Sequence, residues 1–132
     1  MAVSITPFKY KHYAALIEML TSNQADFVKF LDYKTLPKMG YIALLNDQPV
    51  AAGFLRRVEG GYGQLDTFAS NPYFGSKIRH EGLTLVAETL LADAKDLKLK
   101  GLLLITKDPG ILHRAQAKGF TVINQILMGT SY

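Results

Sequence analysis

The sequence has no cysteine and no tryptophan, and none of its apolar runs is long enough to span a membrane. Without cysteine the protein has no disulfide framework and no thiolate metal site, so the redox compartment stays open and the cytoplasm is the default. A spanning helix needs ~20 consecutive apolar residues. The first residues, MAVSITPFKYKHY, also lack the apolar core of a signal peptide. We therefore predict a soluble protein without a membrane partner.

A concentration of charge of one sign is missing as well. Lys and Arg number 15 against 11 Asp and Glu, and the resulting charge of +4 is spread along the chain. Nucleic-acid binders more often carry a basic stripe with interleaved aromatic residues, so we do not expect nucleic acid as a partner, whereas an anionic ligand fits. The three histidines, His12, His80 and His113, have no metal-ligating spacing, and no metal cofactor is expected.

What the sequence does contain is a core of ordinary size: its 132 residues are 48% hydrophobic, which fits one domain over residues 1–132. Hydrophobic periodicity and turn residues predict the elements in chain order. They are a strand at 3–6, helices at 10–23 and 24–33, strands at 40–45, 49–59 and 62–70, a long helix ending near 97, a strand at 101–106 covered on both faces, a short helix within 107–119, and one or two strands in 120–132.

This order predicts an α+β or α/β fold with a mixed central sheet of about six strands and helices on both faces. Hairpin turns join the three strands between residues 40 and 70, whereas the long helix joins strands 62–69 and 101–106 by a right-handed crossover. Such a sheet can splay in the middle, between those two strands. Ligands of α/β sheets bind at breaks of this kind, at the carboxyl ends of strands.

The segment NPYFGSKIRHEGL, residues 71–83, lies between the strand and the long helix that border the predicted break. A strand that turns through glycine into a helix presents free backbone N–H groups to a phosphate. On one interpretation Gly75, Ser76 and Lys77 hold an anion, with Lys77 and Arg79 adding positive charge. On the other they are only a loop and helix start with Ser76 as the N-cap. Both stay open at this point.

The element order, the segment 40–120 and above all "LLLITKDPGILHRAQAKGF" resemble the GCN5-related N-acetyltransferase (GNAT) superfamily. The resemblance implies transfer of an acetyl group from acetyl-CoA to an amine on a small molecule or a protein. In that family the turn after the fourth strand carries Arg/Gln-x-x-Gly-x-Gly/Ala and grips the coenzyme A pyrophosphate. The corresponding turn here is 72–80. The residues that the resemblance implies for coenzyme binding are Phe68, Ala69, Ser70, Gly75, Ser76, Lys77, Ile78 and Arg79.

The sequence departs from the family pattern at two places. The second small residue of the turn is not at the family's spacing, and the family's general acid, a Tyr four residues before the Gly-Phe, is Ala115 here. His113 is the substitute acid that we name, and Asp66 or a water is the base that would deprotonate the acceptor amine. The alternative is a GNAT fold that has lost catalysis and serves as a binding or structural module, similar to acetyltransferase-like proteins of tailed phages.

Three further expectations concern the surface. Arg56 and Arg57 alternate faces of a strand, and we interpret them as guards of a sheet edge rather than ligand contacts. The short C-terminal segment leaves an open edge that a second copy of the chain could cover as a homodimer. Aromatic residues of the first helices could line an acceptor cleft, although core packing is the simpler interpretation; these are Tyr10, Tyr13, Phe27, Phe30 and Tyr33.

Overall fold

The centre of the molecule is one mixed sheet, seen in a computed structural model that describes residues 2–23, 25–105 and 109–122. In these residues five strands lie in the order β1-β2-β3-β4-β5. The strands are β1 (Ser4–Pro7), β2 (Met39–Leu45), β3 (Gln48–Val58), β4 (Tyr62–Ser70) and β5 (Leu102–Leu104). β1 to β4 pair antiparallel, whereas β5 pairs parallel to β4. The sheet is therefore mixed, as predicted.

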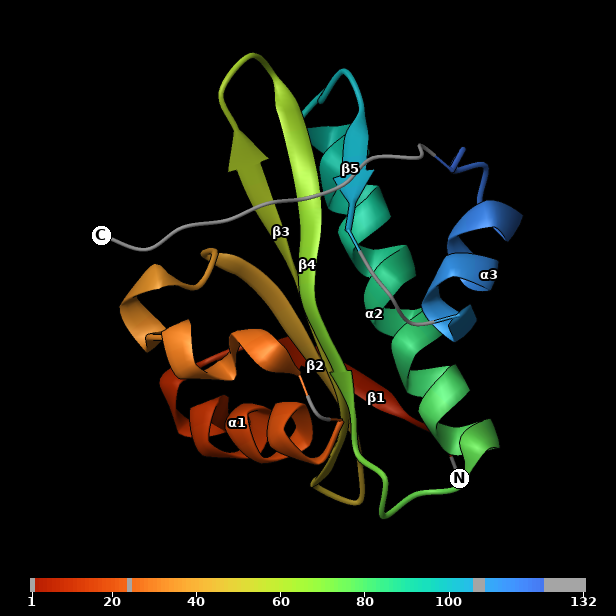
Figure 1. Ribbon diagram of the computed structural model, residues 1–132. Coiled ribbons are helices and arrows are strands. Elements are labelled where there is room, and N and C mark those ends of the chain that lie inside the picture. Colours follow the sequence, from red (N-terminus) through yellow and green to blue (C-terminus); the bar gives the residue numbers. More distant parts are fainter. Residues whose placement is uncertain (1, 24, 106–108, 123–132) are drawn as a thin grey trace.

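Helices cover both faces of this sheet (Figure 1). The helices are α1 (Tyr13–Ser22), α2 (Ser76–Asp96) and α3 (Pro109–Ala117), and the 3₁₀ turns are η1 (Tyr10–His12), η2 (Asp26–Phe30) and η3 (Tyr33–Thr35). α1 and the 3₁₀ turns lie on one side, and α2 and α3 lie on the other. Over the described part of the chain, no helix has both the length and the hydropathy that crossing a membrane requires.

Each face of the sheet has its own hydrophobic cluster. On the α2 side, the helix residues Leu83, Val86, Leu90 and Ala94 pack against strand residues that include Leu55 and Leu65. On the α1 side, the helix residues Leu16, Met19 and Leu20 pack against Ile42, Ala52, Phe54 and Ala69. Side chains alternate between the faces along a strand, so Asp66, next to Leu65, points to the α1 side. The two sides of β4 thus face different layers.

Most of the predicted elements are confirmed. The turn at Asn46 and Asp47 is a two-residue hairpin in which both residues have positive φ, 51° and 63°, as a type I′ turn requires. The first predicted helix is a 3₁₀ turn followed by α1, and it ends at Ser22 as expected. The structure shows five strands where about six were predicted, and the final strands predicted in 120–132 lie almost wholly outside the described residues.

The helix predicted over 24–33 is confirmed only in part. It forms as the short 3₁₀ helix η2, which ends at Phe30; Leu31 is in extended backbone with ψ 134°, and residue 24 lies outside the described residues. The Asp32 side chain accepts the N–H of Lys34 at 3.1 Å. This local bond offers the backbone an alternative to helix, which is why Asp favours turns over helix interiors.

The strand predicted over 101–106 is shorter and less covered than expected. β5 contains only Leu102–Leu104, and the side chain of Leu103 is 45% exposed in the described structure. Leu102 and Leu104 pack against the cluster under α2. In the described residues β5 is therefore covered on one face, although its continuous apolar run predicted a strand covered on both.

α2 approaches the sheet closely because it carries a glycine where it crosses β3. A Cβ at Gly82 would lie 2.7 Å from Cγ1 of Val50 and 3.3 Å from Cβ of Ala51. Neither atom belongs to a flexible side chain, so any larger residue at 82 must push the helix outward. Gly82, which belongs to the turn segment 71–83 by sequence, is therefore a packing residue of α2.

We expect Gly82→Ala to lower the free energy of unfolding by about 1 kcal/mol or more, since overpacking costs about 1–3 kcal/mol and exceeds the gain in helix propensity of about 1 kcal/mol. Urea denaturation of Gly82→Ala, Val50→Ala and the double variant measures the coupling. The double variant should be less destabilised than the sum of the single changes. Simple additivity would show that residue 82 does not press on Val50.

A second prediction concerns pH and the entry to α1. The N–H of Lys9 donates to Nδ1 of His12 at 3.0 Å, a bond that needs the neutral ring. Burial, and then the charges of Lys11 and Lys9, lower the pKa of His12 from 6.5. As the pH falls below that value, the unfolded chain takes up the proton before the folded one, so this stabilisation is lost progressively.

We therefore expect His12→Gln, whose amide oxygen can still accept the Lys9 N–H, to reduce the loss of stability between about pH 7.5 and about pH 5. Urea denaturation at each pH provides the free energies of unfolding. Superimposable pH dependences of wild type and variant would contradict the assignment to His12.

Candidate functional site

The sheet opens between β4 and β5, where the sequence predicts a break. β4 pairs with β5 only through Gly63, Gln64 and Leu65, opposite Leu102–Leu104. From Asp66 to Ser70 the strand continues with no β5 partner in the described structure. Figure 1 shows β5 beside the first part of β4 only. The predicted splay is confirmed.

A β-bulge in β4 lies at the start of this opening. Ala52 pairs with Ala69 and Phe54 pairs with Asp66, so β4 has one residue more than β3 over this interval. A bulge bends its strand and increases the local twist, and bulges are over-represented next to active sites. Here the bend begins directly after Leu65, where pairing with β5 ends.

The bulge contains a strained residue. Thr67 has a φ of +57°, in the left-handed region that β-branched residues rarely adopt. Its hydroxyl donates to Oδ1 of Asp66 at 2.9 Å, which holds the side chain in place. Strained backbone of this kind concentrates at functional sites. No sequence signal marked Thr67, because threonine is an ordinary strand residue.

Beyond the bulge, backbone groups of β4 face the opening. The N–H of Asn71 donates to the carbonyl of Val50 on β3 at 2.8 Å, so by alternation Ala69 also faces β3, whereas Phe68 and Ser70 face away from it. The N–H of Ser70 donates to Oδ1 of Asn23 at 3.2 Å. Two of the three predicted coenzyme contacts on β4, Phe68 and Ser70, therefore direct their backbone groups into the opening. The N–H of Ser70 already has Asn23 as its acceptor.

The N-terminus of α2 lies just after β4 and has no side-chain cap. Gly75 is the N-cap, with φ −66° and ψ 166°, and Ser76 is the first helical residue, so the expectation that Ser76 is the N-cap is wrong. Asn71 organises the turn: its Oδ1 accepts the N–H of Tyr73 at 3.0 Å and its Nδ2 donates to the Pro49 carbonyl at 2.8 Å. The first N–H groups of a helix have no intrahelical acceptor, so those of α2 suit an external one.

The surroundings of this helix start favour an anion. The first turn contains no acidic residue, and a Cβ at Gly75 would meet nothing within 4 Å. Lys77 is exposed in that turn. Nε of Arg79 is buried and has no hydrogen-bond partner in the described structure. The residues from Gly75 to Arg79 therefore fit a phosphate group in charge and in space, although their glycine spacing differs from the family pattern.

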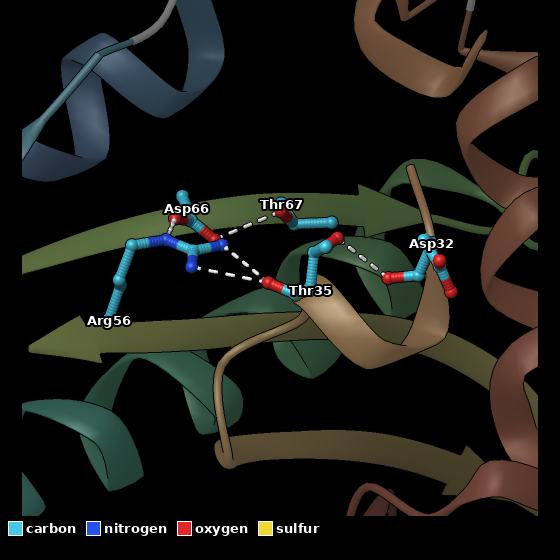
Figure 2. Close-up of polar contacts among 5 residues, drawn as sticks. All are labelled: Asp32, Thr35, Arg56, Asp66 and Thr67. Carbon is cyan, nitrogen blue, oxygen red and sulfur yellow. Dashed lines mark hydrogen bonds and ion pairs between the residues drawn. The ribbon is translucent and has the colours of Figure 1, made fainter. Parts of the chain in front are cut away.

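Asp66 lies on the α1 side of the opening and is held by two donors (Figure 2). Its Oδ2 accepts from Nε of Arg56 at 2.8 Å, and Thr67 binds the other oxygen. Arg56 also donates through both terminal nitrogens to the carbonyl of Thr35 at 3.2 Å. The interpretation of Arg56 and Arg57 as edge guards is wrong, because β3 lies between β2 and β4. The Arg56 guanidinium instead ties η3 to the sheet.

The two predicted catalytic residues are not brought together. Asp66 faces the α1 layer with a side chain that is 18% exposed, whereas His113 is exposed on α3, which packs on the opposite side of the sheet. Ala115, at the position of the family's general acid, is buried on the α2 side of the sheet. No group of three or more His, Asp or Glu side chains in the described ranges is arranged to hold a metal ion.

The splayed sheet, the bulged fourth strand and the helix that starts beside it define the class: the chain has the fold of the GNAT acetyltransferases. An acetyltransferase from Streptococcus agalactiae has a TM-score of 0.76 at 19% identity, with 100% of this chain and 91% of that chain covered. An acetyltransferase of the GNAT family from Staphylococcus aureus has a TM-score of 0.74 at 17% identity, with 94% and 87% covered.

A protein from Mycobacterium tuberculosis in complex with CoA has a TM-score of 0.68 at 17% identity, with 96% of this chain and 76% of that chain covered. No family model matches the sequence, and no curated protein matches it at a significant level. At these identities the similarity establishes the fold, and it confirms the fold implied by the resemblance of segment 40–120.

The strain at Thr67 gives a test of the bulge. We expect Thr67→Val to cost about 1 kcal/mol of stability, since it keeps the β-branched side chain but loses the hydroxyl bond to Asp66. Thr67→Gly loses the same bond but relieves a left-handed strain of roughly 1–2 kcal/mol, so it should be about 1 kcal/mol more stable than the valine variant. Urea denaturation measures both. A valine variant as stable as the glycine variant would contradict the left-handed backbone at 67.

Proposed function

We propose that this protein transfers an acyl group, with acetyl as the simplest case, from acyl-coenzyme A to the nitrogen of an amine on a small molecule or a protein. The observation that carries the proposal is the uncapped start of α2 beside the unpaired half of β4. An anion-binding helix end and an open strand edge, side by side, suit a ligand that has a pyrophosphate at one place and amides at another.

The start of α2 would bind the pyrophosphate. The N–H groups of Ser76, Lys77 and Ile78 would donate to its oxygens, with Gly75 leaving room for the approach. Lys77 and Arg79 would add positive charge, which stabilises an anion most where water is excluded. No acidic residue of the first turn opposes this binding.

The open edge of β4 would hold the amide-bearing arm of the coenzyme as an added strand. The backbone groups of Phe68 face the opening, and its N–H would polarise the thioester carbonyl as negative charge develops on the oxygen. Ala69, the next residue, directs its backbone toward β3, so we assign the polarisation of the thioester carbonyl to Phe68 and not to Ala69. Ser70 would contribute its carbonyl, since its N–H already has Asn23 as an acceptor.

The acceptor amine would approach from the α1 side, where Asp66 lies. Its nitrogen attacks the thioester carbonyl carbon, the C–N bond forms, the C–S bond breaks, and sulfur leaves as the thiolate. The amine proton passes to Asp66, directly or through a water, because a carboxylate with about four acceptor sites still has room beside its bonds to Arg56 and Thr67.

The thiolate leaves with little help, since a thiol pKa of about 8.5 makes sulfur a good leaving group near neutral pH. Ala115 cannot supply a proton. His113 remains the predicted acid, and its exposed place on α3 makes it the residue with the least structural support among those we named.

Ser76→Pro tests the helix start. Proline is well tolerated at the first helical position, and the extended backbone of Gly75, with ψ 166°, is compatible with a proline after it. The substitution nevertheless removes the N–H donor of residue 76. We expect CoA affinity, measured by calorimetry, to fall about tenfold, the effect of one hydrogen bond to a charged group at about 1.5 kcal/mol. Ser76→Ala keeps the N–H and is the matched control.

Equal CoA affinity in the proline and alanine variants, with unchanged thermal midpoints, would show that the pyrophosphate does not bind at this helix start. Wild-type protein that binds no CoA at millimolar concentration would remove the proposal altogether. Binding of acetyl-CoA without thiol release in the presence of a panel of amines would instead favour a non-catalytic binding role.

A further inference from the structure

An apolar cavity of about 280 Å³ lies between α2 and α3, above β4 and β5. Its apolar lining includes Leu65, Phe68, Leu83, Leu104, Ile111 and Ala115. Polar ties between the helices involve residues at its rim: Nε of Arg114 donates to Nδ1 of His80 at 2.8 Å, and Lys118 pairs with Glu88 at 3.0 Å. The two ties hold the helices on either side of a cavity that the side chains do not fill.

The cavity exists because small residues face it. Ala87 on α2 and Ala115 on α3 both line it. Ala115 occupies the position where the resemblance implies a tyrosine, whose ring would take up much of this space. Alanine in place of this tyrosine removes a hydroxyl and also leaves room for an apolar group.

The cavity and the proposed coenzyme site share one residue, Phe68. The backbone of Phe68 faces the opening beside β4, while its side chain lines the cavity. Leu65 and Leu104, which form the last pair between β4 and β5, also line the cavity. A group attached to a thioester at the opening would therefore meet the cavity directly.

The chemistry of the lining selects one part of an acyl-coenzyme A. His80, Thr84, Arg114 and Lys118 also line the cavity, but most of its surface is apolar. The coenzyme's arm contains amides, which would lose hydrogen bonds against the leucine, isoleucine and alanine side chains, at a cost. An alkyl chain has no such groups. By size, a cavity of 150 Å³ takes benzene, so 280 Å³ offers space for roughly ten carbon atoms, whereas an acetyl group brings a single methyl.

We propose that this cavity binds the alkyl part of the acyl group, and that the preferred donor is an acyl-CoA with a medium-length saturated chain rather than acetyl-CoA. This inference rests on the proposed function. The chain enters between α2 and α3 from the opening at Phe68, and Ala87 and Ala115 set the length that fits. The α2 start binds the coenzyme in the same way for every chain length.

Calorimetry with CoA, acetyl-CoA, butyryl-CoA and hexanoyl-CoA tests this in the full-length protein. Each buried methylene should raise affinity about fourfold, so butyryl-CoA should bind at least tenfold more tightly than acetyl-CoA, and hexanoyl-CoA more tightly again. In Ala115→Leu, which fills the cavity, the gain from acetyl to hexanoyl should be lost while the affinity for CoA is kept. Ala87→Leu fills it from α2 and should act alike, which covers the case in which one variant fails to fold.

Gln116→Leu is the matched control, because it adds a leucine on the exposed part of α3 outside the lining and should keep the chain-length dependence. Equal affinities for acetyl-CoA and hexanoyl-CoA in the wild type would overturn the inference while leaving the proposed function intact. A chain-length gain that survives both cavity-filling variants would place the chain elsewhere and also overturn it. Absence of CoA binding would instead contradict the proposed function itself.

Discussion

In the described residues β4 pairs with β5 only up to Leu65, because the bulge at Thr67 bends β4 away directly after that residue. Unpaired backbone that is shielded from water is costly unless another group satisfies it. The N–H of Ser70 is satisfied by Asn23, the C-cap of α1. By alternation along β4, the backbone of Phe68 faces the opening. The strained residue, the splayed sheet and the exposed backbone therefore have one origin, and the ligand site that we propose depends on it.

The two sides of the opening have different chemistry. On the α1 side, Arg56, Asp66, Thr67 and the carbonyl of Thr35 form a connected polar group that fixes η3 against the sheet. On the α2 side lie the uncapped helix start and the apolar cavity beneath α3. A donor that is anionic at one end and apolar at the other fits the second side, and an amine fits the first. In the function that we propose, the sheet would separate the donor from the acceptor, and the two would meet where β4 has no β5 partner in the described residues.

The sequence predicted the parts of this arrangement that local patterns control. Helical spacing, the Asn46-Asp47 turn and the crossover through α2 were enough to place the break in the sheet and the helix beside it. Three features escaped because they depend on contacts distant in sequence. The left-handed conformation of Thr67 comes from the register of β3 against β4, and the pairing of Arg56 with Asp66 depends on the same register. The cavity at Ala115 depends on how α3 lies beside α2, whereas the helix predicted over 24–33 is shorter than expected, and the turn-forming bond of Asp32 that follows it was not recognised.

A crystal structure of the protein grown with coenzyme A would locate the coenzyme relative to α2 and β4. We expect the pyrophosphate within hydrogen-bond distance, about 2.7–3.2 Å, of the N–H groups of Ser76, Lys77 and Ile78, with the arm of the coenzyme paired to the backbone of Phe68. We also expect β4 to keep its bulge and to remain unpaired with β5 beyond Leu65. Coenzyme bound away from the start of α2, or a β4 that pairs with β5 along its whole length, would contradict these expectations.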